Sequence, residues 1–417
     1  MPVPQRLRVS LSETAGGLPR QFWWLWISTL VNRIGGFVVP FLALYLTADR
    51  GYSAAYAGLV ASLFGLGSAI AAIGGGVLTD RIGRRPTLLA AQLGTAVSMA
   101  VLGFADGRTA IAVVAFLVGL ASNASRPAVS AIIADVVPAE DRTRAYSLNY
   151  WAINLGFGVS AALAGLIAAH GYLTLFLLDA VSTLACAVVI FVKIPETKPA
   201  ATAVDRSGPK VGLGTVLRDG RFMAVVGINL LLALIVQQSS STLAIDMGLA
   251  GIPASQYGLV VGLNGLLIVL LQLPLTRLME GRNRTALLAV SVLLIGWGFG
   301  LTMFAGSSAV FYALTVVVWT VGEMMNAPTM MALVAEHSPA RARGRYQGMY
   351  SLSWSLAGFL GPLGGGLLLQ YGGGTAVWGT CAALGTAAAV GFLLLGRRPA
   401  PEPAAATADT GPVRVGA

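Results

Sequence analysis

Four ionisable residues lie inside long apolar segments of the chain, where a charge is expensive. They are Arg33, Arg126, Asp179 and Glu323. We place the remaining charged residues in loops or at segment ends. Inserting a charged side chain at the centre of a lipid bilayer costs about 2.5–3.5 kcal/mol of free energy on insertion scales. Such residues are therefore retained when they form ion pairs, face a water-filled cavity or have a functional role. The acids offer reversible proton binding, and the arginines offer bidentate binding of carboxylate or phosphate.

Glu323 is the first candidate for a proton-coupling site. Trp319, Glu323, Asn326 and Met330 are spaced so that they share one face of a helix. An apolar setting disfavours a bare carboxylate, so Glu323 could take up and release a proton during a transport cycle. The alternative is a structural acid paired with an arginine. Asp179 is a second candidate for proton coupling, and a structural role is its alternative as well.

The sequence leaves three roles open for the two arginines. Asn32 precedes Arg33, and Ser122 and Asn123 lie about one turn before Arg126. Either arginine could bind the carboxylate or phosphate of a substrate. Either could instead keep an acid charged until it is displaced, or form a fixed buried salt bridge.

Further polar and aromatic residues are expected to line a substrate cavity together with the two arginines. Aromatic walls with a few polar groups suit amphipathic substrates, and ordinary helix packing is the alternative. These predicted cavity residues are Asn32, Asn123, Tyr150, Trp151, Asn154, Asn229, Gln237, Trp319, Asn326, Tyr350 and Trp354.

The composition indicates that membrane-spanning helices position these side chains. Hydrophobic residues make up 56% of the 417 residues, charged residues make up 11%, and the mean hydropathy is +0.76. A soluble domain carries about 25% charged residues, so lipid is the expected solvent for most of this chain. About 20 apolar residues span a bilayer as a helix. Twelve segments qualify: 22–46, 55–78, 87–105, 110–134, 145–168, 173–193, 221–247, 255–279, 285–305, 309–334, 346–370 and 375–396.

The basic residues predict the orientation of these spans. Apart from Arg33, Arg126, Arg50 and Arg108, all of the 27 Lys and Arg residues lie in the terminal segments or in the loops on the same side. By the positive-inside rule that side is cytoplasmic, so we expect a multi-pass protein of the inner (plasma) membrane with both termini in the cytoplasm. The net charge of +10 is therefore a topology signal, and no nucleic-acid partner is expected.

The chain contains an internal repeat. SRPAVSAIIADVVPAEDRTR (125–144) aligns without a gap with NAPTMMALVAEHSPARARGR (326–345), which matches Pro127 with Pro328 and Asp135 with Glu336. Repeats of this kind build secondary transporters with a substrate site between the halves. We expect an N-terminal segment, a six-helix bundle, a linker, a second six-helix bundle and a disordered tail. Their ranges are 1–21, 22–193, 194–220, 221–396 and 397–417.

The segment GVLTDRIGRR (76–85) resembles, at every defined position, the signature of the major facilitator superfamily. The resemblance implies an all-α membrane protein with twelve transmembrane helices in two pseudo-symmetric six-helix bundles. It also implies a cytoplasmic gate that latches that side shut in the outward-open state, with Arg81 reaching an acid such as Asp135. The gate residues it implies are Gly76, Asp80, Arg81, Gly83, Arg84 and Asp135. The counterpart TRLMEGRNR (276–284) is degenerate.

A second resemblance concerns the branch of this superfamily. GFLGPLGGG (358–366), in the eleventh span, looks like a Gly-Pro-Gly-Gly signature that drug:proton antiporters carry in the fifth. The fifth span here reads GFGVSAALAG (156–165), without the proline. The first span, VNRIGGFVVPFLALYL (31–46), has the arginine of the peptide-carrier motif and lacks its glutamates.

No ATP-binding loop and no metal-ligand cluster is evident in the sequence, and two isolated cysteines form no disulfide framework. We therefore expect no cofactor, no metal and no enzymatic activity. The leading hypothesis is a monomeric proton-coupled exporter of small amphipathic compounds, with protons, a small-molecule substrate and membrane lipid as its partners. The alternatives are a proton symporter or facilitator that imports a peptide, sugar or organic anion, and a membrane sensor that moves nothing.

Overall fold

The computed structural model describes residues 16–197, 213–338 and 343–397, and within these ranges the chain is helical and contains no strand. The predicted all-α membrane fold is confirmed. The helices are α2 (Arg20–Ile34), α3 (Val38–Leu44), η1 (Tyr45–Asp49), α4 (Ala54–Ile82), α5 (Arg84–Phe104), α6 (Arg108–Val136), η2 (Ala139–Asp141), α7 (Arg142–Ala168), α8 (Tyr172–Lys193), α9 (Leu213–Arg218), α10 (Gly220–Val236), η3 (Gln237–Ser240), α11 (Thr242–Leu249), α12 (Ala254–Met279), α13 (Arg284–Gly300), η4 (Leu301–Phe304), α14 (Ala309–His337) and α15 (Arg343–Arg397).

Eleven helical stretches in the described ranges are long and apolar enough to cross a membrane. The last of them, Arg345–Gly396, has 52 residues, which is about twice what one crossing needs. Gly373 interrupts it with φ 72° and ψ −179°, so that α15 folds into two arms. The predicted twelve crossings are therefore present.

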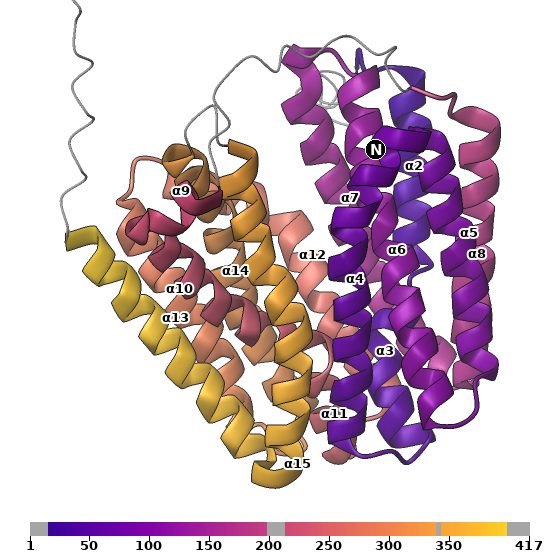
Figure 1. Cartoon of the computed structure of the whole chain (residues 1–417). Coiled ribbons are helices and arrows are strands. Elements are labelled where there is room, and N and C mark those ends of the chain that lie inside the picture. The colour runs from indigo at the N-terminus through magenta and orange to yellow at the C-terminus, as the bar shows by residue number, and fades with distance from the viewer. Residues whose placement is uncertain (1–15, 198–212, 339–342, 398–417) are drawn as a thin grey trace, which may run out of the picture.

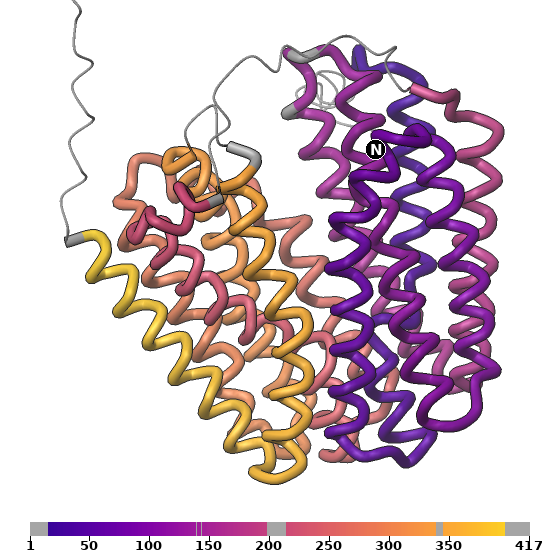
Figure 2. Tube along the Cα trace, viewed as in Figure 1, coloured from indigo at the N-terminus to yellow at the C-terminus, as the bar shows by residue number. Residues whose placement is uncertain are grey.

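The helices form two bundles that diverge towards one end of the molecule (Figures 1 and 2). The N-terminal bundle contains α2 to α8, and the C-terminal bundle contains α10 to α15. We call the end at which α8 ends and α9 begins the linker end. Most of the predicted terminal segments and linker lies outside the described residues, namely 1–15, 198–212 and 398–417.

The first helix of each bundle is interrupted at an equivalent place. In the N-terminal bundle, residues 35–37 separate α2 from α3. In the C-terminal bundle, η3 and Ser241 separate α10 from α11. The register that carries Pro127 onto Pro328 also carries Gly36 onto Gln237. Discontinuous helices at matching positions in two repeats are typical of the region where transporters bind their substrates.

The bundles touch where backbone approaches backbone. The helix α7 packs on α12, and α4 packs on α15. A Cβ atom on Gly265 would lie 2.6 Å from the carbonyl oxygen of Asn154 and 2.8 Å from Cα of Gly158. The glycine-rich segments 156–165 and 358–366 both lie in these contacts, so their small residues serve close packing between the bundles.

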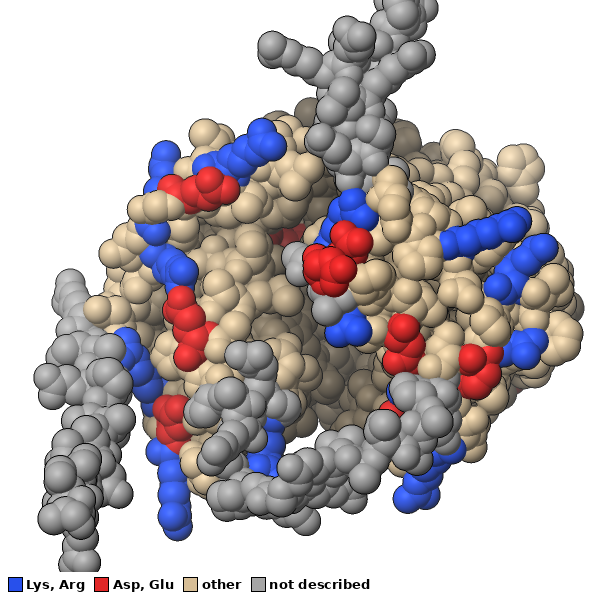
Figure 3. Space-filling model, turned by 90° about the horizontal axis from the view of Figure 1, so that it is seen from above, with Lys and Arg blue, Asp and Glu red and all other residues tan. Residues whose placement is uncertain are grey.

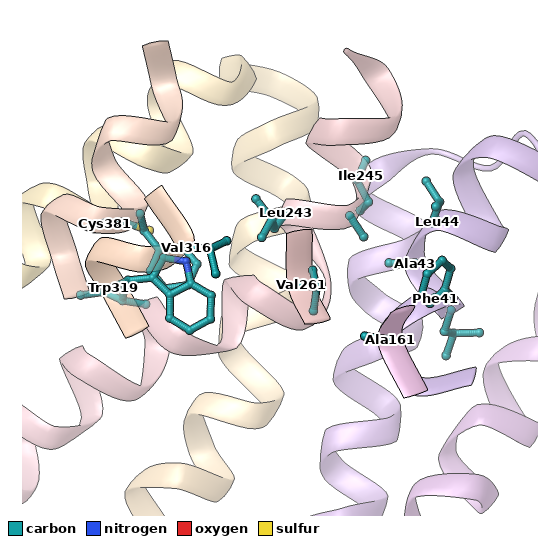
Figure 4. Packing of buried hydrophobic residues seen from close by; sticks show 14 of the residues in the cluster. Phe41, Ala43, Leu44, Ala161, Leu243, Ile245, Val261, Val316, Trp319 and Cys381 are labelled. Carbon is teal, nitrogen blue, oxygen red and sulfur yellow. The ribbon is translucent and has the colours of Figure 1, made fainter. Parts of the chain in front are cut away.

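Apolar packing closes the end opposite the linker. Figure 4 shows Ile245 of α11 beside Leu44 of α3, and Gly248 of α11 also contacts Leu44. The ring of Tyr257 meets Phe41 edge to face at 5.0 Å, and its hydroxyl donates to the carbonyl of Pro40 at 2.8 Å.

One further hydrogen bond joins the bundles at the same end. The backbone N–H of Ala55 donates to Oε1 of Gln370 at 3.0 Å. Within the described ranges, every hydrogen bond that connects the two bundles lies at this end. The structure is therefore closed opposite the linker and open at the linker end.

The contact at Gly265 yields a test. Gly265→Leu forces α12 away from α7, and overpacking of this kind costs about 1–3 kcal/mol. We expect a cysteine placed at Ser255, at the start of α12, to react faster with a maleimide than it does without the leucine. The native thiols of Cys186 and Cys381 are buried and give little background.

The matched control is Gly227→Leu, because a Cβ atom on Gly227 meets nothing within 4 Å. Equal labelling rates for the Gly265→Leu and Gly227→Leu proteins would show that this contact does not hold the bundles together.

Candidate functional site

A hollow opens between the two bundles at the linker end. Figure 3 looks into it, and Lys, Arg, Asp and Glu side chains surround its mouth. The depth of a residue below this mouth follows from its helix position at about 1.5 Å per residue. Arg33 and Glu323 both lie about 20 Å from the linker ends of their helices, and Arg126 lies about 15 Å from the linker end of α6. These three ionisable residues thus occupy similar depths below the mouth, towards the middle of their helical spans.

Glu323 is held by neutral groups. Its Oε2 accepts a hydrogen bond from Nδ2 of Asn264 at 3.0 Å, and the same amide nitrogen donates to Oγ1 of Thr320 at 3.0 Å. The side chain is half-buried, and Tyr150 of α7 lies within electrostatic range. Because Asn264 belongs to α12, the carboxyl group lies beside the helix pair α7 and α12, through which the bundles touch.

Asp179 fastens the break in the first helix. It is 3% exposed, its Oδ2 accepts from the backbone N–H of Val38 at 3.2 Å, and its Oδ1 accepts from Oγ1 of Thr183 at 3.4 Å. A carboxylate at a helix N-terminus satisfies free N–H groups and is favoured by the helix dipole. Asp179 therefore has a structural role, because it caps the N-terminus of α3.

Arg33 and Arg126 do not form the ion pairs with buried acids that the sequence left open. Within the described part of the chain, no ion pair joins Arg33 or Arg126 to an acid. Arg33 packs against Gly156 of α7, and its charge lies within electrostatic range of those of Arg126 and Asp179. The side chain of Arg126 is exposed. The fixed salt bridge considered for each arginine is absent from this structure.

Two of the predicted cavity residues in the N-terminal bundle hold its helices together. Nδ2 of Asn32 donates to Oε1 of Gln92 and to Oγ1 of Thr183, each at 3.3 Å. Nδ2 of Asn123 donates to Oγ of Ser68 at 2.7 Å. Both amides are thus used between helices of one bundle, which limits what they can offer a substrate.

Three predicted cavity residues in the C-terminal bundle are buried. Asn229 donates to Oγ of Ser353 at 2.8 Å, and Asn326 donates to Oγ of Ser291 at 2.9 Å. Trp319 is 4% exposed and packs against α13. The residues that we expected on one face of the helix at 309–334 therefore contact two different helices. Glu323 faces α12, whereas Trp319 and Asn326 face α13.

The aromatic residues of α7 and α15 are more accessible. Tyr150 is 45% exposed and Trp151 is 40% exposed, and Trp151 stacks on Trp26 with ring centroids 6.3 Å apart. Other predicted cavity residues that are half-buried are Asn154, Gln237, Tyr350 and Trp354.

In this conformation, which is open at the linker end, the signature loop between α4 and α5 contains an ion pair that the sequence did not predict. Nε of Arg84, rather than Arg81, donates to Oδ2 of Asp135 at 3.0 Å. Asp80 lies 3.7 Å from Arg84 and its side chain is 79% exposed. An exposed Asp80 agrees with a gate that is open at the linker end.

Glu196, which the sequence analysis did not single out, completes this loop. Its carboxylate accepts from the backbone N–H groups of Arg84 and Arg85 at 3.0 and 3.2 Å, at the first turn of α5. Gly83 has φ 114°, and a Cβ atom there would lie 2.9 Å from Cδ of Glu196. The glycine is needed both for the turn and for this approach.

The degenerate second loop reproduces the same interaction. Arg284, at the start of α13, pairs with Glu336 near the end of α14. Glu336 is the repeat equivalent of Asp135, so the internal symmetry extends to this ion pair. The loss of the aspartate from the second motif did not remove it.

Asp246 of α11 is a further acid, near the end of the predicted segment 221–247, that the sequence did not single out. Its Oδ2 accepts from the hydroxyl of Tyr312 at 2.7 Å and from Nε1 of Trp378 at 3.0 Å. It therefore joins α11 to α14 and α15 near the closed end. A count of acids within the predicted spans could have found it.

The two equivalent ion pairs differ in exposure, which makes them a matched experiment. The side chains of Arg84 and Asp135 are 13% and 17% exposed, whereas those of Arg284 and Glu336 are 52% and 56% exposed. Screening by water weakens exposed pairs to below about 1 kcal/mol. We expect a coupling energy of about 1–3 kcal/mol for Arg84 and Asp135 and a smaller one for the second pair.

The measurement is a double-mutant cycle for each pair, with Arg→Gln, Asp→Asn and Glu→Gln changes and the free energy of unfolding in detergent as the readout. Equal coupling energies, or a larger value for Arg284 and Glu336, would contradict the expectation.

Comparison with known proteins supplies the family. Residues 25–362, and separately 243–415, match the model of the Major Facilitator Superfamily. The MFS-type transporter YhjO of Bacillus subtilis, itself uncharacterized, is 25% identical over 352 residues, which cover 84% of this chain and 86% of the relative. The multidrug resistance protein MdtH of Salmonella arizonae is 26% identical over 358 residues, with 84% and 86% coverage.

Solved structures share the fold. A POT family transporter in complex with 5-aminolevulinic acid superposes with a TM-score of 0.74 at 16% identity, over 91% of this chain and 96% of the other. The nucleoside transporter NupG superposes with a TM-score of 0.75 at 12% identity, over 91% and 100%. At these identities the likeness concerns the fold alone.

Proposed function

Because the chain belongs to the Major Facilitator Superfamily, whose members are transporters rather than enzymes, we propose that it is a proton-coupled exporter of small amphipathic compounds. The observation that carries the proposal is Glu323, a mid-membrane acid without a cationic partner among the described residues, at the contact between the bundles. Secondary transporters of this architecture move their substrates by rocking one bundle against the other around a central site.

The surroundings of Glu323 suit reversible protonation. A buried charge that no opposite charge offsets is costly, and binding a proton removes that cost. The carboxyl group keeps a hydrogen-bond partner in either form, because Asn264 presents both an N–H donor and a carbonyl acceptor. Since Asn264 belongs to α12, a change of charge on Glu323 acts on the helix that packs against α7. Protonation and the movement of the bundles are thereby coupled.

The direction of transport is part of the proposal. The linker end is assigned to the cytoplasm because the basic loops lie there. The hollow then faces the cytoplasm and accepts substrate from that side. The multidrug resistance proteins among the relatives favour export. The exposed aromatic side chains of Tyr150 and Trp151 suit amphipathic substrates.

Asp179 takes a different part in this scheme. Its hydrogen bonds to Val38 and Thr183 assign it to holding the start of α3, and we rank it behind Glu323 as a proton carrier. The scheme includes a monomer in the inner (plasma) membrane that carries protons and one small-molecule substrate.

The test is proton flux in liposomes that contain the purified protein and a trapped pH dye. With an imposed pH gradient, we expect an amphipathic cation, a sugar, a dipeptide and an organic anion, added one at a time, to reveal at least one substrate that moves opposite to protons. Glu323→Gln should abolish the proton movement, because an amide does not titrate, while leaving the folded protein intact.

Glu336→Gln is the matched control, since Glu336 lies on the same helix but in an exposed ion pair. Wild-type proton flux in the Glu323→Gln protein would refute its role. Movement of substrate and protons in the same direction would replace the exporter with a symporter, and movement of substrate without protons would replace it with a facilitator.

A further inference from the structure

The five ionisable residues within the spans differ in how they are satisfied. Within the described ranges, the three acids take their hydrogen bonds from uncharged groups, and none of them forms an ion pair with an arginine. Asp179 accepts from a backbone N–H and a threonine, Glu323 accepts from an asparagine, and Asp246 accepts from a tyrosine and a tryptophan. Among the residues that the structure describes, Arg33 and Arg126 therefore have no direct counter-ion in this conformation.

The two arginines are close enough to repel each other. Arg33 of α2 is half-buried, and its charge lies within electrostatic range of the like charge on Arg126 of α6. Asp179 lies beyond ion-pair distance of Arg33 and accepts a hydrogen bond from the backbone N–H of Val38. Two guanidinium groups thus create a region of positive potential deep in the N-terminal bundle.

Two observations favour a position of both arginines beside the central hollow. Arg126 is exposed although it lies about 15 Å inside α6, and an arginine at that depth is not expected to face lipid. Arg33 packs against Gly156 of α7, one of the helices that contact the opposite bundle. Both lie at about the depth of Glu323, where substrate sites of paired-repeat transporters are found.

On this basis we infer that the site takes an amphipathic anion, a molecule with a carboxylate or phosphate group that Arg33 and Arg126 bind and an apolar body that lies along the exposed aromatic side chains of α7. Planar guanidinium groups bind such anions through two parallel hydrogen bonds. The inference rests on the proposed transport function and narrows its substrate class. Binding of the anion offsets the positive charge of the two arginines and so reduces the repulsion between them. The net charge of the site therefore differs between the loaded and the empty carrier.

The test is equilibrium binding of three probes that share one fluorescent body: dansylglycine, dansylamide and dansylcholine, which are anionic, neutral and cationic. The protein is held in phosphatidylcholine nanodiscs with no pH gradient. We expect the wild-type protein to bind dansylglycine about tenfold more tightly than dansylamide, which corresponds to about 1.4 kcal/mol.

Arg33→Gln and Arg126→Gln should each remove most of this preference without changing dansylamide binding. Arg126→Lys should keep part of it, because lysine retains the charge and loses the planar fork. Arg282→Gln is the matched control, since it removes one exposed positive charge from a loop at the linker end.

Equal affinity for the three probes would overturn the inference. So would an equal loss of all three in the glutamine variants, which would make the arginines structural. Size-exclusion chromatography and thermal unfolding identify a variant that does not fold. If a variant is lost in this way, the probe preference of the wild-type protein still tests the anion site. Loss of dansylglycine binding when phosphatidylglycerol is added would assign the arginines to a lipid headgroup and would also overturn the inference.

The outcome is separable from that of the proposed function. Binding requires no gradient, so loss of proton coupling with a retained anion preference would refute the exporter and leave the anion site standing. Proton exchange with dansylcholine in liposomes, together with no preference for dansylglycine, would refute the anion site and leave the exporter standing.

Discussion

The structure depends on a close approach of backbone to backbone between two six-helix bundles. At the contact of α7 with α12, glycines face each other so closely that Gly265 has no room for a Cβ atom. In lipid there is no hydrophobic driving force between helices, so contact surface and small residues must provide the attachment. The same helices carry Asn264 and Tyr150, which place the acid Glu323 within reach of this contact. A movement at the contact therefore alters the surroundings of the acid.

Charge is distributed unevenly along the path that a substrate would follow. At the linker end, arginine and acid pair in both repeats, and Glu196 adds a helix cap to the first of them. Midway along the spans, Asp179 and Glu323 accept hydrogen bonds from neutral donors, and within the described part of the chain Arg33 and Arg126 form no ion pair. At the closed end, Asp246 joins three helices through an aromatic pair. Among the described residues, the arginines of the apolar spans thus lie between two ends where acids have partners.

Sequence reasoning reached the fold more securely than the site. The twelve spans were predictable because a bilayer imposes a length and an apolar composition on every crossing, and the basic loops added an orientation. The residues that carry charge were predictable for the same reason, apart from Asp246, which lay at a predicted segment end. Their partners were not predictable. Periodicity placed Trp319, Glu323 and Asn326 on one face, yet a helix with neighbours on several sides divides such a face among them.

The sequence by itself determined the solvent, the number of crossings, the repeat and the signature loop, because each depends on local composition or on identity at a fixed spacing. Only the tertiary structure decided that Arg84 meets Asp135 in this conformation, that Asp179 caps α3, and that no ion pair joins Arg33 or Arg126 to an acid among the described residues. These outcomes depend on the rotation of each helix about its axis and on its depth against its neighbours. Such quantities are set by packing between segments far apart in the chain, and a pattern along one segment does not contain them.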